Sequence, residues 1–304
     1  MERILNRREF LGAGVSATLA LSLTPMEVPQ QAIIDIHQHT HYARRSDGNL
    51  VAHQRTMGVT RTVLLPAGSQ LGLDAECGGN QTVVDLRNEF PSEFVFFANE
   101  VPNLDIARTV IEKYLKIGAC GIGEQKFPID CDSPAIIKIA QLAQEYQVPI
   151  LLHFQHNKYN TNFLRFHRIL ERFPKVNFIG HAQTFWGNID KNHAQEVLYP
   201  KGPVTPGGYT DKLLSDYPNM FADLSAGSAL NALTRDKDHA REFLKRHKSK
   251  VLYGSDCDDA IGDGKKCSGS ECLQILRQLI TSRSALEEAL SENAKRVIPM
   301  DRKA

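Results

Sequence analysis

The sequence predicts an α/β fold, a single-domain (β/α)8 TIM barrel. Eight short apolar runs follow residue 31 and alternate with longer amphipathic stretches, a pattern typical of parallel βα units. A doubly wound open sheet is the structural alternative. No Gly-x-Gly-x-x-Gly follows the first run, however, so the nucleotide-binding form of that sheet has no support. The expected strands are residues 32–36, 60–65, 94–98, 120–122, 150–152, 176–179, 220–222 and 251–253.

The composition is that of an ordinary globular protein. Of 304 residues, 42% are hydrophobic and 23% charged, and the formal net charge is +1, so no basic footprint for nucleic acid is present. No low-complexity tract or linker divides residues 31–304, which we therefore interpret as one domain. The composition leaves the oligomeric state open and allows a homo-oligomer.

Residues 1–30 are predicted to be a signal peptide and short linker rather than part of the fold. Arg7-Arg8 precedes Phe10 and an apolar run from Leu11 to Leu23, which is too short to span a bilayer and is typical of a twin-arginine signal. The alternative is a disordered basic terminus. The prediction is export to the periplasm or the extracellular space, without stable membrane association after signal removal.

Two stretches between the expected strands carry helical spacing. One face of residues 106–115 contains Ile106 and Ile111, and Ser133-Pro134 gives a capping residue and a first-turn proline to a helix over 133–146. Residues 182–210 form a long stretch rich in proline and glycine after the sixth strand. We expect it to be a lid or substrate loop, with Trp186 at its start.

The first expected strand ends in Asp35-Ile36-His37-Gln38-His39. Because alternate residues of a strand point the same way, His37 and His39 are expected to project together. Two imidazoles on one side of a strand end make half of a metal site. Alone, this pair is equally well explained as a hydrogen-bonded polar pair.

Other strand ends carry further metal-competent side chains. His153 ends the fifth strand, His181 ends the sixth, and Asp256 follows the eighth. In a barrel these ends converge on the face where active sites lie. Five such residues spread over more than half of the chain therefore predict one pocket that holds a divalent metal.

These motifs resemble the amidohydrolase superfamily of metal-dependent barrels. The resemblance rests on Asp-Ile-His-x-His, Leu-Leu-His, Gly-His and Tyr-Gly-Ser-Asp, and on the closing Glu292-Asn293-Ala294-Lys295-Arg296. The closest branch is the amidohydrolase-related one (amidohydrolase 2), which includes aminocarboxymuconate-semialdehyde decarboxylase and dicarboxylate lactonases. The resemblance covers residues 32 to about 300.

The resemblance implies roles for the matching residues. His37, His39 and His153 are expected to bind a divalent metal, with zinc the expected ion, and Asp256 is the fourth protein contact and general base. His181 is expected to hold or polarise the substrate, or to bind a second metal. A bound water, made more acidic by the metal, would be the nucleophile.

The fourth strand leaves the number of ions open. Glu124 and Lys126 lie at its end, where some relatives place a bridging Glu or a carboxylated Lys. Glu124 is thus a tentative ligand of a binuclear site with His153 and His181. The alternative is a Glu124–Lys126 ion pair beside a single ion.

Weaker candidates surround this set. His41 and His156 are interpreted as pocket-rim or solvated histidines, and Arg44-Arg45 as a partner for a substrate carboxylate or, equally, as solvated arginines. Any disulfide among the six cysteines is expected near Cys257, Cys267 and Cys272. The remaining histidines of the helical stretches are predicted to be at the surface; they are His167, His193, His239 and His247.

The sequence therefore predicts a metal-dependent hydrolase that acts on a C–O or C–N bond of a small molecule through a metal-activated water. The first alternative is a metal-dependent decarboxylase on the same barrel site. The second is an exported barrel that binds metal or ligand without turnover. Neither the substrate nor the number of ions, one or two, follows from the sequence.

Overall fold

The structure is a computed structural model that describes residues 31–69, 77–263 and 267–302. The chain divides into two compact units, Met1–Gln31 and Ala32–Ala304. The predicted twin-arginine segment lies outside the described residues, and its prediction is not tested. Within the described ranges, no helix is long and apolar enough to cross a membrane.

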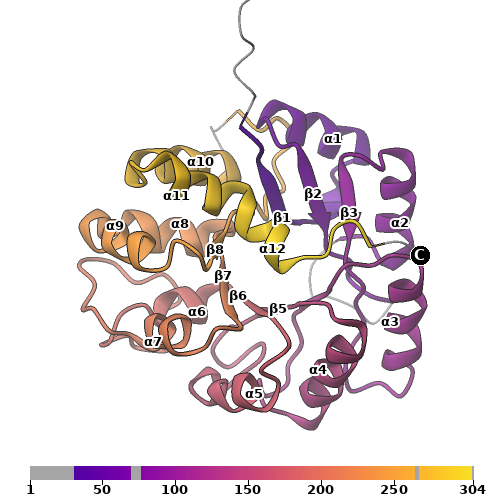
Figure 1. The fold of residues 1–304 in the computed structure, drawn as a ribbon, viewed down its shortest axis with the longest axis horizontal. Coiled ribbons are helices and arrows are strands. Elements are labelled where there is room, and N and C mark those ends of the chain that lie inside the picture. The colour runs from indigo at the N-terminus through magenta and orange to yellow at the C-terminus, as the bar shows by residue number, and fades with distance from the viewer. Residues whose placement is uncertain (1–30, 70–76, 264–266, 303–304) are drawn as a thin grey trace, which may run out of the picture. The chain divides into compact units, whose positions relative to one another are not determined.

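All eight expected strands are present, and every pairing between them is parallel. The strands lie at the centre of the unit and the helices surround them (Figure 1). The TIM-barrel prediction is therefore confirmed. The strands are β1 (Ile34–Gln38), β2 (Arg61–Leu64), β3 (Phe94–Phe96), β4 (Ile122–Gln125), β5 (Ile150–His153), β6 (Phe178–His181), β7 (Met220–Asp223) and β8 (Val251–Leu252).

The hydrogen-bond ladder of the barrel is interrupted. Strands β1–β3 form one sheet and β4–β8 another. A few backbone hydrogen bonds span the two junctions. At one, Ala98 forms an isolated bridge with Ile122, and at the other the Ile36 N–H donates to the Tyr253 carbonyl and the Asp256 N–H to the His37 carbonyl. The strands thus follow one another around the barrel in chain order, without a continuous ladder.

The barrel interior is filled by side chains from successive strands. Ile36, Val63, Phe97, Leu151 and Ile179 belong to one buried cluster, as expected for a packed barrel core. Residues of the closing helix and the segment after it, Ala294, Val297, Ile298 and Met300, join the same cluster. The C-terminal segment therefore closes the end of the barrel opposite to the strand ends that carry the predicted site.

The helices form the outer layer and cover a larger buried core. Helix α4 begins as predicted, because the Ser133 side chain accepts from the Ile136 N–H and Pro134 occupies the first turn. The helices are α1 (Asp47–Thr56), α2 (Asn80–Glu89), α3 (Ala107–Lys116), α4 (Pro134–Tyr146), α5 (His167–Arg172), α6 (Gln183–Gly187), α7 (Tyr209–Asp216), α8 (Ala226–Thr234), α9 (Lys237–Arg246), α10 (Ser268–Leu279), α11 (Arg283–Glu287) and α12 (Asn293–Val297). Short 3-10 helices occupy Tyr42–Arg44 and Phe163–Arg165, and a π-helical segment occupies Glu288–Glu292 between α11 and α12.

Some details differ from the prediction. The 182–210 stretch contains α6 and the start of α7, and Trp186 is buried, with its Nε1–H donating to the Asp223 carbonyl. Ile106 precedes α3 and is exposed. His239 and His247 are buried rather than at the surface, because α9 packs its apolar face inward and Asp211 pairs with His247.

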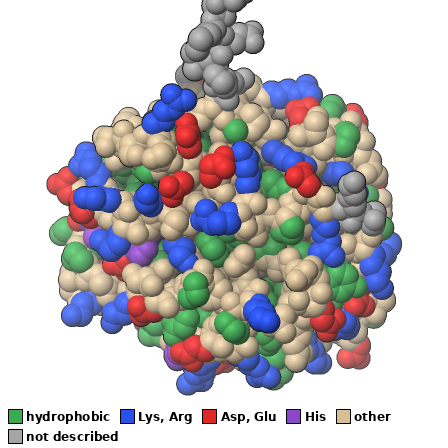
Figure 2. Space-filling view, in the orientation of Figure 1, with side chains coloured by type: hydrophobic (Ala, Val, Ile, Leu, Met, Phe, Trp, Pro, Cys, Tyr) green, Lys and Arg blue, Asp and Glu red, His purple; other side chains and the backbone are tan. Residues whose placement is uncertain are grey.

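The surface carries charges of both signs. On the face seen in Figure 2, lysine and arginine side chains are intermingled with aspartate and glutamate side chains, and small hydrophobic areas lie between them. This face therefore has no extended region of a single charge.

Candidate active site

The structure brings the predicted site residues together at the carboxyl ends of the strands. His37 comes from β1, Glu124 from β4, His153 from β5 and His181 from β6. His39 directly follows β1, and Asp256 follows β8. The four histidines and Glu124 are buried. They approach one another as imidazole and carboxylate pairs. The structure thus brings these side chains together at one face of the barrel.

An irregular register places His37 and Glu124. The pairing of β1 with β2 shifts between Asp35 and Gln38, and that of β4 with β5 shifts between Ile122 and Gln125. Such irregularities re-aim side chains next to active sites. The first of these shifts explains why Ile36, in the barrel core, is followed directly by the inward-facing His37.

Ligand atoms of His37, His39 and Asp256 are grouped as a metal site requires, and a carboxylate oxygen of Glu124 lies close to both imidazoles. His37 Nε2 lies 3.2 Å from His39 Nε2, and each is 3.6–3.7 Å from Asp256 Oδ1 and from Glu124 Oε2. Ligand bonds of about 2.0–2.1 Å around a tetrahedral ion place neighbouring donors about 3.3 Å apart. These residues therefore fit a divalent ion such as zinc, and imidazole with carboxylate is a suitable donor set.

The outer hydrogen bonds of His37 and His39 leave the correct nitrogens available. His39 Nδ1 lies 2.7 Å from the Leu65 carbonyl oxygen, which only accepts, so Nδ1 carries the proton. His37 Nδ1 likewise donates to Asp223 Oδ2 at 2.7 Å. Both Nε2 lone pairs then face the shared centre. This carboxylate–imidazole arrangement is the usual outer support of a metal ligand.

Asp223 also orients His181. Its Oδ2 lies 3.2 Å from His181 Nδ1 and accepts from the Ser225 hydroxyl at 2.7 Å. The Ser225 Oγ is in turn 3.0 Å from His181 Nδ1. His181 Nε2 therefore points toward the second oxygen of Asp256, at 3.4 Å. One buried carboxylate thus fixes two rings of the site.

His153 joins the site through Glu124. Its Nδ1 lies 2.6 Å from Glu124 Oε1, whereas the other oxygen of Glu124 faces His37 and His39. His153 Nε2 is 3.4 Å from Gln155 Oε1. His37, Glu124 and His181 form a second group of converging donors. The geometry thus offers two three-donor groups that share His37.

The electrostatics favour positive charge at this centre. Burial disfavours the ionised carboxyl of Asp256, but His37 and His181 outweigh burial and hold its pKa well below the usual value. Burial is likewise outweighed at Glu124, where His153 and Lys126 lower the pKa. At His39 burial is overcome by Cys77 and Asp256, which raise the pKa to about 10. Two ionised carboxylates therefore face imidazoles, as expected where a cation binds.

Several other residues that the sequence suggested for the site contact protein groups instead of facing the converging histidines. Arg45 is buried and donates to the carbonyls of Cys257 and Asp259 at 2.8 Å, so neither interpretation of its side chain was correct. The predicted Glu124–Lys126 ion pair is absent among the described residues, and the Lys126 ammonium instead lies 5.6 Å from the Tyr159 ring centre. His41, which is exposed, pairs with Asp47. The half-buried His156 lies near Glu196.

Sequence reasoning missed Asp223. It ends β7 in Met220-Phe221-Ala222-Asp223, so the rule that identified His153 and His181, a polar residue at the end of an apolar run, also applies to it. Cys77 was missed as well, and no sequence signal connects it with His39.

Comparisons with known proteins agree with this architecture. No family model matches the chain, and no curated protein matches it. Among solved structures, an amidohydrolase from Burkholderia multivorans with bound zinc has a TM-score of 0.62 at 11% identity and covers 88% of this chain and 98% of that chain. A putative 2-pyrone-4,6-dicarboxylic acid hydrolase from Pseudomonas putida has a TM-score of 0.60 at 15% identity, with 90% and 99% covered.

A structure of 2,6-dihydroxybenzoate decarboxylase with 2,6-dihydroxybenzoate is similar too, with a TM-score of 0.56 at 12% identity and 88% and 99% covered. These structures are members of the superfamily that the motifs resemble, and they include hydrolases and decarboxylases. At such identities the likeness establishes a shared barrel fold. The donor set of this chain, imidazole with carboxylate, is of the kind that can hold a divalent metal.

Proposed function

We propose that this protein is a metal-dependent hydrolase of the amidohydrolase superfamily that acts on a C–O or C–N bond of a small molecule. The observation that carries the proposal is the convergence of His37, His39 and Asp256 at separations that suit one divalent ion, with Glu124 Oε2 3.6–3.7 Å from both imidazoles. Zinc is the ion we propose. If Asp256 Oδ1 held such an ion, its second oxygen would still face His181 Nε2, at 3.4 Å.

Asp256 is the proposed general base. A bound divalent ion supplies Lewis acidity and lowers the pKa of water. The ionised Asp256 carboxylate can accept the proton of an attacking water and return it to the leaving group. His181, held through Nδ1 by Asp223 and Ser225, presents Nε2 to the same space. We assign it the role of binding the substrate oxygen on which charge develops.

We propose one catalytic ion rather than two. A second ion at His181 and Glu124 would have to compete with His153 Nδ1 for Glu124 Oε1, which the imidazole approaches to 2.6 Å. In this arrangement His153 orients Glu124 from the side away from His37 and His39. Glu124 is then a ligand of the single ion, and its loss should lower metal content by one equivalent.

The test compares metal content and turnover of the wild type, Glu124→Ala and the control Glu93→Ala. Glu93 pairs with Arg55 outside the site, so its variant should match the wild type. Glu124→Ala should lose about one equivalent of metal and nearly all turnover of a panel of lactones, esters and amides. Unchanged metal content in Glu124→Ala would contradict the proposed centre.

The same panel decides between reaction classes. Small aromatic and unsaturated acids are included, and carbon dioxide release is measured beside hydrolysis. Glu124-dependent carbon dioxide release without any hydrolysis would replace the hydrolase by a decarboxylase. Tight, Glu124-dependent metal binding without turnover of either set would favour a barrel that binds without catalysis.

We also propose export through a twin-arginine pathway, supported by Arg7-Arg8 and the apolar run that follows. The test is cell fractionation of the full chain and of a variant with both arginines replaced by lysine. Export of the wild type alone is expected, and equal export of both would contradict the proposal.

A further inference from the structure

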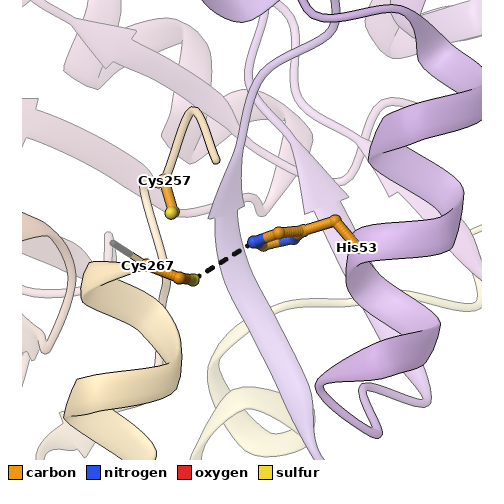
Figure 3. A group of neighbouring side chains, drawn as sticks. All are labelled: His53, Cys257 and Cys267. Atoms are coloured by element: carbon orange, nitrogen blue, oxygen red, sulfur yellow. Dashed lines mark hydrogen bonds between the residues drawn. The ribbon is translucent and has the colours of Figure 1, made fainter. Parts of the chain in front are cut away.

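A second group of potential ligands lies apart from the proposed catalytic centre. His53 comes from α1, Cys257 follows Asp256 after β8, and Cys267 immediately precedes α10 (Figure 3). Their side chains are buried, and one ligand atom from each lies within 4.8 Å of the others. His53 Nε2 is 3.1 Å from Cys267 Sγ. Three chain segments thus bring one imidazole and two sulfurs to a common point.

The hydrogen bonds around His53 fix which nitrogen faces the sulfurs. Gln54 Nε2 donates to Asp35 Oδ2 and to Thr62 Oγ1, so the orientation of the Gln54 amide is set. Its Oε1 therefore accepts from His53 Nδ1–H, at 2.9 Å. Consequently His53 Nε2 carries a lone pair and points at the sulfurs. An imidazole whose other nitrogen donates to an oxygen is the usual form of a metal ligand.

A fourth soft donor is close to this group. Met57 Sδ, at the end of α1, lies 3.7 Å from Cys267 Sγ and is buried. Bonds of about 2.3 Å to sulfur and about 2.0 Å to nitrogen imply donor separations of about 3.5–3.8 Å around a tetrahedral ion. The observed separations are compatible with such an ion after small shifts. Thiolate and thioether sulfur favour thiophilic ions.

We propose that His53, Cys257 and Cys267 bind a thiophilic d10 metal ion, Zn²⁺ or Cu⁺, with Met57 as the neighbouring fourth donor. This centre is separate from the proposed catalytic one, since it shares no ligand with it. The two cysteines are reduced in the structure. A disulfide between them would leave the buried lone pair of His53 Nε2 without a thiol donor or a metal ion to bind.

Charge balance allows such an ion in a buried position. Two thiolates neutralise a divalent ion, and a monovalent ion leaves one negative charge. The buried Arg45 guanidinium lies beside the group, because its Nη1 donates to the Cys257 carbonyl at 2.8 Å. Buried charges are tolerated when they are paired in this way.

The proposed ion would tie α1 to the loop that carries Asp256. This loop already packs closely on α1, since a Cβ at Gly262 would come within 2.7 Å of the His53 carbonyl oxygen. Cross-linking α1, Cys257 and Cys267 through one ion would restrict movement of the residue next to the proposed base. The centre is therefore structural, and it positions Asp256 without contacting substrate.

The experiment uses Co²⁺ as the probe, bound to the full chain after metal removal under reducing conditions. Because Cys77 neighbours His39, all variants carry Cys77→Ser, which leaves the catalytic centre without a thiol neighbour among the described residues. Thiolate–cobalt charge-transfer absorption in the near ultraviolet is expected in this background. It should be lost in Cys257→Ala and Cys267→Ala but retained in Cys120→Ala, whose thiol is buried elsewhere against the Phe96 carbonyl.

Absence of the thiolate band from the Cys77→Ser background overturns the proposal without any need for the other variants to fold. X-ray absorption of the wild type gives the same decision, since a sulfur shell at about 2.3 Å is required. Recovery of a Cys257–Cys267 disulfide from non-reduced protein also overturns it.

Glu124→Ala separates this inference from the proposed function. Once the catalytic ion is lost, one equivalent should remain, and its identity distinguishes Zn²⁺ from Cu⁺. The thiolate band should be unchanged in this variant. If only the catalytic proposal is wrong, the thiolate–cobalt band is still observed. If only the cysteine-site proposal is wrong, metal content still depends on Glu124.

Discussion

Two clusters of potential metal ligands, which differ in chemistry, are linked by the peptide bond between Asp256 and Cys257. Asp256 faces His37, His39 and His181 with its carboxylate, whereas the next residue, Cys257, joins His53 and Cys267 on the other side of the loop. The first cluster combines imidazole with carboxylate, and the second combines imidazole with sulfur. Asp256 has a positive φ of 41° in the loop after β8, and the side chains of these two adjacent residues join different clusters.

The clusters differ in whether a polar side chain remains directed at the space beside the proposed ion. In the first, Asp256 keeps an oxygen directed at His181, so a base remains beside the ion. In the second, the side chains that the structure describes around the sulfurs are potential ligands or buried supports of them. An open position is typical of catalytic metal centres and a closed set of structural ones. Three substitutions test this contrast.

The largest effect is expected from Asp256→Asn. Asparagine keeps the size of the side chain and one oxygen but cannot accept a proton. Turnover should therefore fall by about 10²- to 10⁴-fold, the usual contribution of a general base, while most of the catalytic metal is retained. The measurement is kcat beside metal content.

Asp258→Asn is the matched control for that substitution, since Asp258 is exposed two residues further along. It should leave both quantities unchanged. Normal turnover in Asp256→Asn would show that Asp256 is not the general base. The two clusters would then no longer differ in having a base beside the proposed ion.

A smaller effect, confined to the first cluster, is expected from Asp223→Asn. The Asp223 carboxylate orients both His37 and His181, and its Oδ1 finds no hydrogen-bond partner among the described residues. Loss of its charge should weaken catalytic metal binding by about 10- to 100-fold. Metal titration of the variant checks this, with exposed Asp216→Asn as control. A thiolate–cobalt band that weakened equally would show that the two clusters are not independent.

The contrast also shows what sequence reasoning could reach. The strands and the first cluster were predicted because each ligand follows an apolar run, and parallel strand ends converge on one face. The second cluster could not be predicted in this way. His53 lies inside a helix, and its distance in the chain from Cys257 and Cys267 carries no signal until the fold closes.

Finer features of the site depended on backbone detail and on partners from distant elements. The register shifts that turn His37 and Glu124 inward have no sequence signature of their own. Arg45 was expected at a pocket or in solvent, yet carbonyl groups of the loop after β8 satisfy its guanidinium in the interior. His247 was likewise assigned to the surface, because its buried partner Asp211 lies on another helix and cannot be recognised from the sequence around His247.

The smallest effect on either cluster is expected from Trp186→Phe. The sequence suggested that Trp186 begins a substrate loop, but its ring packs beside Phe185 and Phe243 and its Nε1–H donates to the Asp223 backbone carbonyl at 3.0 Å. Phenylalanine keeps an aromatic ring and leaves that buried carbonyl without its donor, at a cost of about 1–3 kcal/mol in the free energy of unfolding. Denaturant unfolding should report this loss, while KM, metal content and the thiolate–cobalt band stay unchanged. A raised KM without loss of stability would instead show that Trp186 contributes to substrate binding, as the sequence suggested. The hydrogen bond from Trp186 to the Asp223 carbonyl would then not be important for stability.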